Sequence, residues 1–135
     1  MVDTSVWSLA LRRDGECEQP EVRALESALR SGTLVTTTGI VLQELLQGFA
    51  GPRNRERIVQ RFAALPLVQA DRRDHIEAAS LRNTCRRAGV QLGTIDALIA
   101  QLCIRHDLAL LTTDRDFHHA AAHCPLAVWP EQPPL

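Results

Sequence analysis

Lysine and tyrosine are both absent from this chain of 135 residues, so its 15 Lys-or-Arg positions are all arginine. Response-regulator receivers, phosphatases of the haloacid-dehalogenase type and P-loop NTPases each contact phosphate through a lysine. The chain therefore belongs to none of these classes. Aromatic residues are also scarce, with two Trp and three Phe. Stacking of bases on an aromatic platform is accordingly not expected as the main mode of nucleic-acid recognition.

Long apolar runs are missing as well. No segment approaches the roughly 20 apolar residues that a membrane-spanning helix needs, and no basic-then-apolar signal segment precedes the first helical pattern. No two cysteines stand at a short paired spacing, which favours reduced thiols and a cytoplasmic protein. The four cysteines are Cys17, Cys85, Cys103 and Cys124. His119 and His123 would share a helical face, but a fourth ligand for a structural zinc ion is not evident.

Length and patterning predict a single α/β domain. A hydrophobic fraction of 45% and a net charge of −1 are those of an ordinary globular protein. Apolar periodicity predicts helices over 5–12, 20–30, 53–65, 73–88 and 114–122, with further helices capped by Thr37 or Thr38 and beginning near Thr94. Short strand candidates cover 2–4, 34–36, 67–68, 108–112 and 126–129. This alternation predicts a short central parallel sheet flanked by helices on both faces, in a domain of residues 1–130 followed by a Pro-rich tail, 131–135.

Four acidic residues stand far apart in the sequence, each where an element begins or ends or on the flank of a helix. They are Asp3, Glu44, Asp96 and Asp114. A fold that gathers carboxylates generally needs cations to offset their repulsion, and Mg²⁺ or Mn²⁺ prefers such oxygen ligands. Metals in an all-oxygen site can activate water and stabilise charge on phosphate. The pattern therefore indicates a metal-dependent nuclease.

Each acid also has an ordinary structural interpretation. Asp3 and Asp114 can cap the helices that follow them, Asp96 can complement a helix dipole, and Glu44 can be an exposed helical residue. Position in the sequence alone leaves both interpretations open.

Three motifs carry a resemblance to a known family. They are Asp-Thr-Ser-Val-Trp from Asp3, Leu-Gly-Thr-Ile-Asp-Ala-Leu-Ile-Ala around Asp96, and Leu-Leu-Thr-Thr-Asp-Arg-Asp-Phe around Asp114, with Glu44 on a helix between the first two. In this order they resemble the PIN domain, and within it the VapC-type toxins of bacterial toxin–antitoxin pairs. The resemblance covers nearly the whole chain, from about Val2 to Trp129.

The resemblance implies an endoribonuclease that uses one or two Mg²⁺ or Mn²⁺ ions, held by Asp3, Glu44, Asp96 and Asp114. Asp116 is a fifth candidate metal ligand, and Ser5 and Thr113 are candidate supporting hydroxyls. The resemblance further implies a VapB-type antitoxin partner and a homodimer. It also implies a structured substrate such as transfer or ribosomal RNA, whose cleavage inhibits translation and growth. Two alternatives are an RNA-processing PIN nuclease outside any toxin pair and a catalytically silent RNA-binding module. Arginine pairs such as Arg86–Arg87 can contact RNA phosphates, but the sequence does not choose among them.

Overall fold

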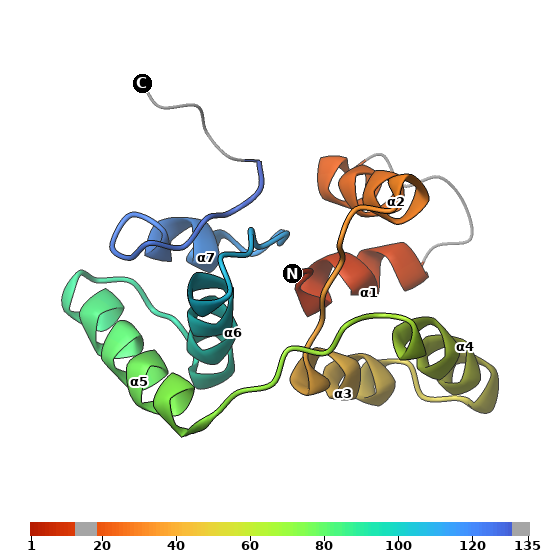
Figure 1. Ribbon diagram of the computed structural model, residues 1–135, viewed down its shortest axis with the longest axis horizontal. Helices are drawn as coiled ribbons and strands as arrows, with labels where there is room; N and C mark the ends of the chain where they lie inside the picture. The colour runs from red at the N-terminus through yellow and green to blue at the C-terminus, as the bar shows by residue number, and fades with distance from the viewer. Residues whose placement is uncertain (13–18, 131–135) are drawn as a thin grey trace. The chain divides into compact units, whose positions relative to one another are not determined.

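The computed structural model describes residues 1–12 and 19–130. Cys17, Arg13 and the expected tail 131–135 lie outside the described residues. The chain divides into two compact units, one of Val2–Val68 and one of Met1 with Gln69–Leu135 (Figure 1). None of the helices in the described part of the chain is long and apolar enough to cross a membrane.

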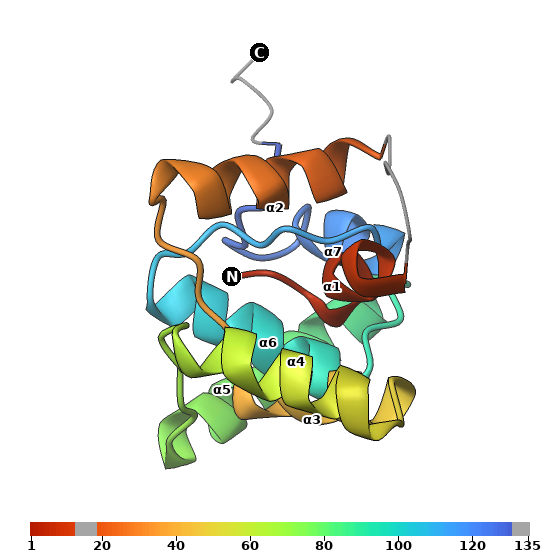
Figure 2. The ribbon, with the colours of Figure 1, turned by 90° about the vertical axis from the view of Figure 1, so that its right-hand side faces the viewer.

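The unit Val2–Val68 contains four of the helices. They are α1 (Thr4–Arg12), α2 (Pro20–Ser31), α3 (Gly39–Gly48) and α4 (Pro52–Ala63). α1 packs against α2 and α3, and α3 packs against α4; Figures 1 and 2 both show α3 and α4 side by side. The Trp7 and Phe62 rings meet in the core at a centroid distance of 4.8 Å. The Thr38 hydroxyl caps α3 by accepting from the Val41 N–H, and Gly32 ends α2 at a φ of +74°, which only glycine adopts freely.

The second unit contains α5 (Arg72–Arg87), α6 (Thr94–Arg105) and α7 (Arg115–Ala120). α5 and α6 pack against one another along an apolar seam. α5 begins with a capping box in which Asp71 and Asp74 each accept the other's backbone N–H. The Asp74 carboxylate is fully buried. It also accepts bidentate hydrogen bonds from Arg105 on α6, from Nε to Oδ1 at 2.6 Å and from Nη2 to Oδ2 at 2.7 Å. This ion pair joins the start of α5 to the end of the helix that bears Asp96.

In each unit, two segments of extended backbone form a parallel bridge in place of long strands. Thr37 pairs with Leu67 in the first unit, and Leu110 pairs with Val128 in the second. In the strand candidate 108–112, Leu110 and Thr112 are fully buried, whereas Ala109 is exposed. Among the described residues the pairing does not extend beyond such isolated bridges, so the predicted central sheet flanked on both faces stays a prediction.

The helix predictions are confirmed, with small differences at the ends. α4 ends at Ala63, two residues before the predicted end. The helix expected over 114–122 is shorter, because Asp114 lies outside α7 as its N-cap and the chain turns after Ala120. Cys85, Cys103 and Cys124 are free thiols, and burial raises the pKa of Cys85.

Candidate functional site

Asp3 stands at the start of α1 and is almost completely buried, with 6% of its surface exposed. Its backbone carbonyl accepts the N–H groups of Val6 and Trp7, which begin the helix. Its side chain is held separately, because the Ser5 hydroxyl donates to Asp3 Oδ2 at 2.8 Å. A buried carboxylate is thus fixed in direction by a hydroxyl two residues along.

Glu44 projects from the middle of α3 and is half-buried. The hydroxyl of Thr4 donates to Glu44 Oε1 at 3.1 Å, across 40 positions of sequence. Residues 3–5 therefore supply one carboxylate and two hydroxyls, and each hydroxyl donates to one of the two candidate acids of this unit. The contact between Thr4 and Glu44 is a connection that the sequence did not reveal.

Asp96 lies in the first turn of α6, where the positive helix end favours a carboxylate. It is half-buried. Gly93, the N-cap of this helix, has no side chain to cap it, and a Cβ added at Gly93 would lie 3.8 Å from Asp96 Oδ2. The Asp96 carboxylate therefore turns back toward the loop that precedes its own helix.

Asp114 and Asp116 lie at the start of α7. The Asp114 side chain caps that helix, accepting the Asp116 N–H on Oδ1 at 2.9 Å. The Asp114 N–H in turn donates to the buried Thr112 hydroxyl at 3.0 Å. The hydroxyl that contacts the Asp114 backbone thus comes from Thr112, whereas Thr113, which is half-buried, keeps its supporting role only as a prediction.

A pocket of about 490 Å³ lies next to these acids in the second unit. Asp116 and Gly93 line it together with Arg82 and Arg86 from α5 and the loop residues 90–92. Asp116 is the candidate acid that lines this pocket with the two arginines, and Gly93 is the N-cap of the helix that bears Asp96. Sequence reasoning had grouped Arg86 with its neighbour Arg87 and had passed over Arg82; the spacing of four residues between Arg82 and Arg86 was the available signal.

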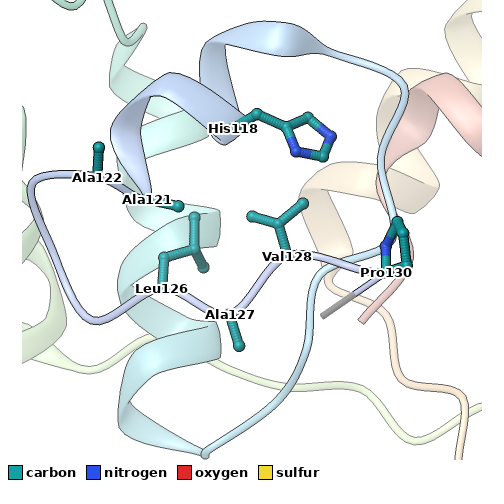
Figure 3. Close-up of a pocket in the computed structure, with 7 residues that line it drawn as sticks. All are labelled: His118, Ala121, Ala122, Leu126, Ala127, Val128 and Pro130. Carbon is teal, nitrogen blue, oxygen red and sulfur yellow. The ribbon is translucent and has the colours of Figure 1, made fainter. Parts of the chain in front are cut away.

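Two other pockets in this unit have a different character. One of about 550 Å³ is lined by His118 of α7 and by apolar residues of the segment that follows the helix. Figure 3 shows His118 from α7 gathered around it with Leu126, Val128 and Pro130. The other, of about 290 Å³, lies against α5 and α6 and includes His123 and Cys124. Neither is lined by a candidate carboxylate.

The donor atoms of the candidate residues are all carboxylate oxygens, which suits Mg²⁺ or Mn²⁺ and does not suit a thiolate-seeking metal. Within neither unit do the described residues gather three His, Cys, Asp or Glu side chains around one point. The first unit supplies Asp3 and Glu44, and the second supplies Asp96, Asp114 and Asp116. That these acids act on one metal cluster stays a prediction from the sequence.

Comparison with known proteins places the chain in a family. The model of the PIN domain matches residues 1–123. Ribonuclease VapC11 of Mycobacterium tuberculosis is 30% identical over 119 residues, which cover 87% of this chain and 87% of the relative. A VapC ribonuclease of Mycobacterium bovis matches to the same extent.

Solved structures share the fold. The crystal structure of VapBC2 from Rickettsia felis, bound to a DNA fragment from its promoter, contains a chain with a TM-score of 0.72 and 18% identity, with 95% of both chains covered. FitAcB from Neisseria gonorrhoeae gives a TM-score of 0.67 at 21% identity, with 94% of both chains covered. The chain therefore belongs to the PIN-domain family, and within it to the VapC-type proteins.

Proposed function

We propose that this protein is a Mg²⁺- or Mn²⁺-dependent endoribonuclease and the toxin of a toxin–antitoxin pair. The observation that carries the proposal is the 30% identity over 119 residues with proteins named VapC ribonucleases. The substrate is RNA, with transfer or ribosomal RNA as the expected targets, and its cleavage inhibits translation and growth.

We assign Asp3, Glu44, Asp96 and Asp114 as the catalytic carboxylates. Bound divalent cations would activate water and stabilise charge on the phosphate. The chain's own contribution is to orient the oxygens that hold them. Ser5 and Thr4 fix the directions of Asp3 and Glu44 through hydrogen bonds, and Asp96 lies in the first turn of α6, where the helix end favours its charge.

Asp114 contributes differently, because its Oδ1 already accepts the Asp116 N–H. This bond fixes the rotation of the carboxylate and directs its second oxygen. Asp116 follows on α7 and lines the pocket beside Gly93, which suits a ligand or a group that holds metal-associated water. We rank it below the other four.

We propose further that a VapB-type antitoxin binds the protein and that a homodimer forms; the similar chains belong to the structures of VapBC2 and FitAcB. We also propose a short central parallel sheet flanked by helices on both faces, in a domain of residues 1–130 with 131–135 as a tail. The protein would act in the cytoplasm, where its RNA substrates are.

Cleavage of total bacterial RNA by the purified protein tests this function. Discrete fragments are expected with Mg²⁺ or Mn²⁺ and none with EDTA, and Asp3→Asn and Asp96→Asn should each remove cleavage while the fold is retained. Asp107→Asn is the matched control, because Asp107 is exposed at a φ of +52° that Asn tolerates. Full activity in both site variants would overturn the residue assignment. No cleavage by folded, metal-loaded protein would favour the silent RNA-binding module instead.

The toxin role has its own test. Expression of the wild-type chain in a bacterial host should arrest growth, and co-expression of the small gene next to it should restore growth. Metal-dependent cleavage without growth arrest would favour an RNA-processing nuclease outside a toxin pair.

A further inference from the structure

The pocket lined by Arg82, Arg86, residues 90–93 and Asp116 is named here the arginine pocket. Its positive side comes from one face of α5, because Arg82 and Arg86 are four residues apart and so lie one above the other. Asp116, in the first turn of α7, also lines it. Both signs of charge thus face one cavity of about 490 Å³.

The two arginines are held differently. Arg82 is half-buried, and its Nε donates to the Leu92 carbonyl at 2.9 Å, which fixes the guanidinium against the loop. That bond uses one of the five N–H groups that a guanidinium carries. Arg86, one turn further along α5, is exposed and lines the same cavity. The pocket therefore presents one pre-oriented guanidinium and one that can move toward a ligand.

The arginine pocket is continuous with the candidate acids of its unit. Gly93 is at once a lining residue and the neighbour of Asp96 Oδ2. Asp116 is a lining residue whose N–H binds Asp114 Oδ1. An anion seated against Arg82 and Arg86 would consequently lie beside Asp116 and the loop that precedes Asp96.

We propose that the arginine pocket binds a backbone phosphate of the RNA strand next to the phosphodiester that is cleaved, with Arg86 as its main contact and Arg82 as a fixed second donor. The proposal rests on the proposed ribonuclease function and adds a substrate subsite to it. A guanidinium fork matches the oxygens of a phosphate, and contacts to phosphate position a strand without reading its sequence. A polyanion accompanied by divalent cations also suits a cavity that contains both arginines and Asp116.

Arg87 provides a matched control on the same helix. It differs from Arg86 by one position, is likewise exposed, and carries the same charge. Its Nη2 donates to the Thr84 hydroxyl at 3.3 Å, and it does not line the arginine pocket. Arg86→Gln and Arg87→Gln therefore remove the same charge from the same helix and differ in whether the arginine pocket loses a donor.

The experiment measures binding of a short, mixed-sequence, fluorescein-labelled single-stranded RNA by anisotropy, over a series of salt concentrations. Asp96→Asn in every protein, with Mg²⁺ present, prevents cleavage during the measurement. With Arg86→Gln the affinity should fall roughly three- to tenfold, and the slope of log K against log salt should become shallower by about 0.7, the value for one lost phosphate contact on a single strand. With Arg87→Gln both quantities should stay near those of the parent. Arg86→Lys, which keeps a point charge, should retain most of the slope.

Equal effects of Arg86→Gln and Arg87→Gln would overturn the proposal, because they would indicate only the general field of the surface. No effect of Arg86→Gln would overturn it as well. A cleavage assay with Asp96 intact distinguishes failure of the subsite proposal from failure of the proposed ribonuclease function. If the wild-type protein cleaves RNA and Arg86→Gln has an unchanged KM, the subsite proposal is wrong and the ribonuclease function is retained. If no protein with intact carboxylates cleaves RNA, the proposed function has failed first. Thermal unfolding of each variant checks that the fold is retained.

Discussion

Replacement of Arg105 by Met should destabilise the protein, because it leaves the buried Asp74 carboxylate without its counter-ion. The Arg105 guanidinium donates to both oxygens of Asp74, at 2.6 and 2.7 Å, and to the Gln69 carbonyl at 3.2 Å. Asp74 itself is fully buried. Met keeps much of the side-chain length but removes every donor, so the buried carboxylate keeps the backbone N–H of Asp71 and loses its counter-ion.

The magnitude follows from burial on the two sides of the pair. Removal of one partner from a buried ion pair costs about 3–5 kcal/mol. The Arg105 side chain is 37% exposed, whereas that of Asp74 is 0% exposed. Water that reaches the arginine screens the pair, so we reduce the expected cost to about 2–3 kcal/mol. At roughly 3–5 °C per kcal/mol for a chain of this size, Tm should fall by about 10 °C.

The pH dependence of this cost gives a sharper test. Burial alone would raise the pKa of Asp74, but the Asp71 N–H and then Arg105 outweigh it and hold that pKa below its ordinary value. A lowered carboxyl pKa contributes stability that is present above the ordinary value and is lost as pH falls through the folded-state pKa. Without Arg105 the upward effect of burial is less opposed. The difference in unfolding free energy between wild type and Arg105→Met should therefore shrink from pH 7 to about pH 4.

The assay is urea unfolding of both proteins at several pH values, with Arg87→Met as control. Arg87, like Arg105, lies in the last turn of its helix, so the control accounts for the lost interaction with the helix dipole. A cost no larger than that of Arg87→Met, or one that is the same at pH 4 and pH 7, would refute the reasoning. Asp96 lies nine residues earlier on α6, about 13.5 Å along the axis. Arg105→Met should accordingly still cleave RNA at temperatures where it is folded.

Three further predictions concern a backbone conformation, a hydrogen bond and metal binding. Gly89→Ala should lower the free energy of unfolding by about 1–2 kcal/mol, because Gly89 has a φ of +82°. In Gly39→Ala, a helical position with nothing within 4 Å of the added Cβ, that free energy should not fall by more than about 0.5 kcal/mol. Urea unfolding of the pair decides whether backbone conformation is the cause. Ser5→Ala removes the 2.8 Å hydrogen bond to Asp3 and should lower kcat for RNA cleavage roughly tenfold. Ser5→Thr keeps the hydroxyl and should recover most of the wild-type kcat. Equal kcat in the wild type and both variants would exclude Ser5 from the site. Mn²⁺ should raise the Tm of the wild-type protein more than that of Asp96→Asn, and an equal rise in both would separate Asp96 from metal binding.

The helices could be predicted from the sequence because their signals are local. α2 begins at Pro20 and ends before Gly32, and α6 begins at Thr94, as periodicity and the end residues indicated. α7 was overestimated because a run of alanines continues the helical pattern past Ala120, where the chain turns. The pairing of extended segments is a different problem. Leu110 and Val128 meet across 18 positions, and no local pattern specifies which segments pair or how far the pairing extends.

The motifs select candidate site residues, but they do not show the contacts of those residues. The motifs select Asp3, Glu44, Asp96 and Asp114, yet they do not reveal that Thr4 reaches Glu44. They also do not reveal that the Asp114 N–H donates to the Thr112 hydroxyl, and the supporting role of Thr113 stays a prediction. The arginine pocket could not be predicted from the sequence, because it depends on where a loop places residues 90–93 beside α5.

Asp114 shows why a structural role and a chemical role need not exclude each other. Its Oδ1 accepts the Asp116 N–H and caps α7, which is the ordinary interpretation of an acid before a helix. A carboxylate has two oxygens and about four lone-pair positions, so a cap uses one direction and fixes the others. Fixed geometry is what a metal ligand requires, since a freely rotating carboxylate must lose that freedom on binding. The capping bond therefore supports the proposed metal role of Asp114, and it also directs the chain so that Asp116 lines the arginine pocket beside Arg82 and Arg86.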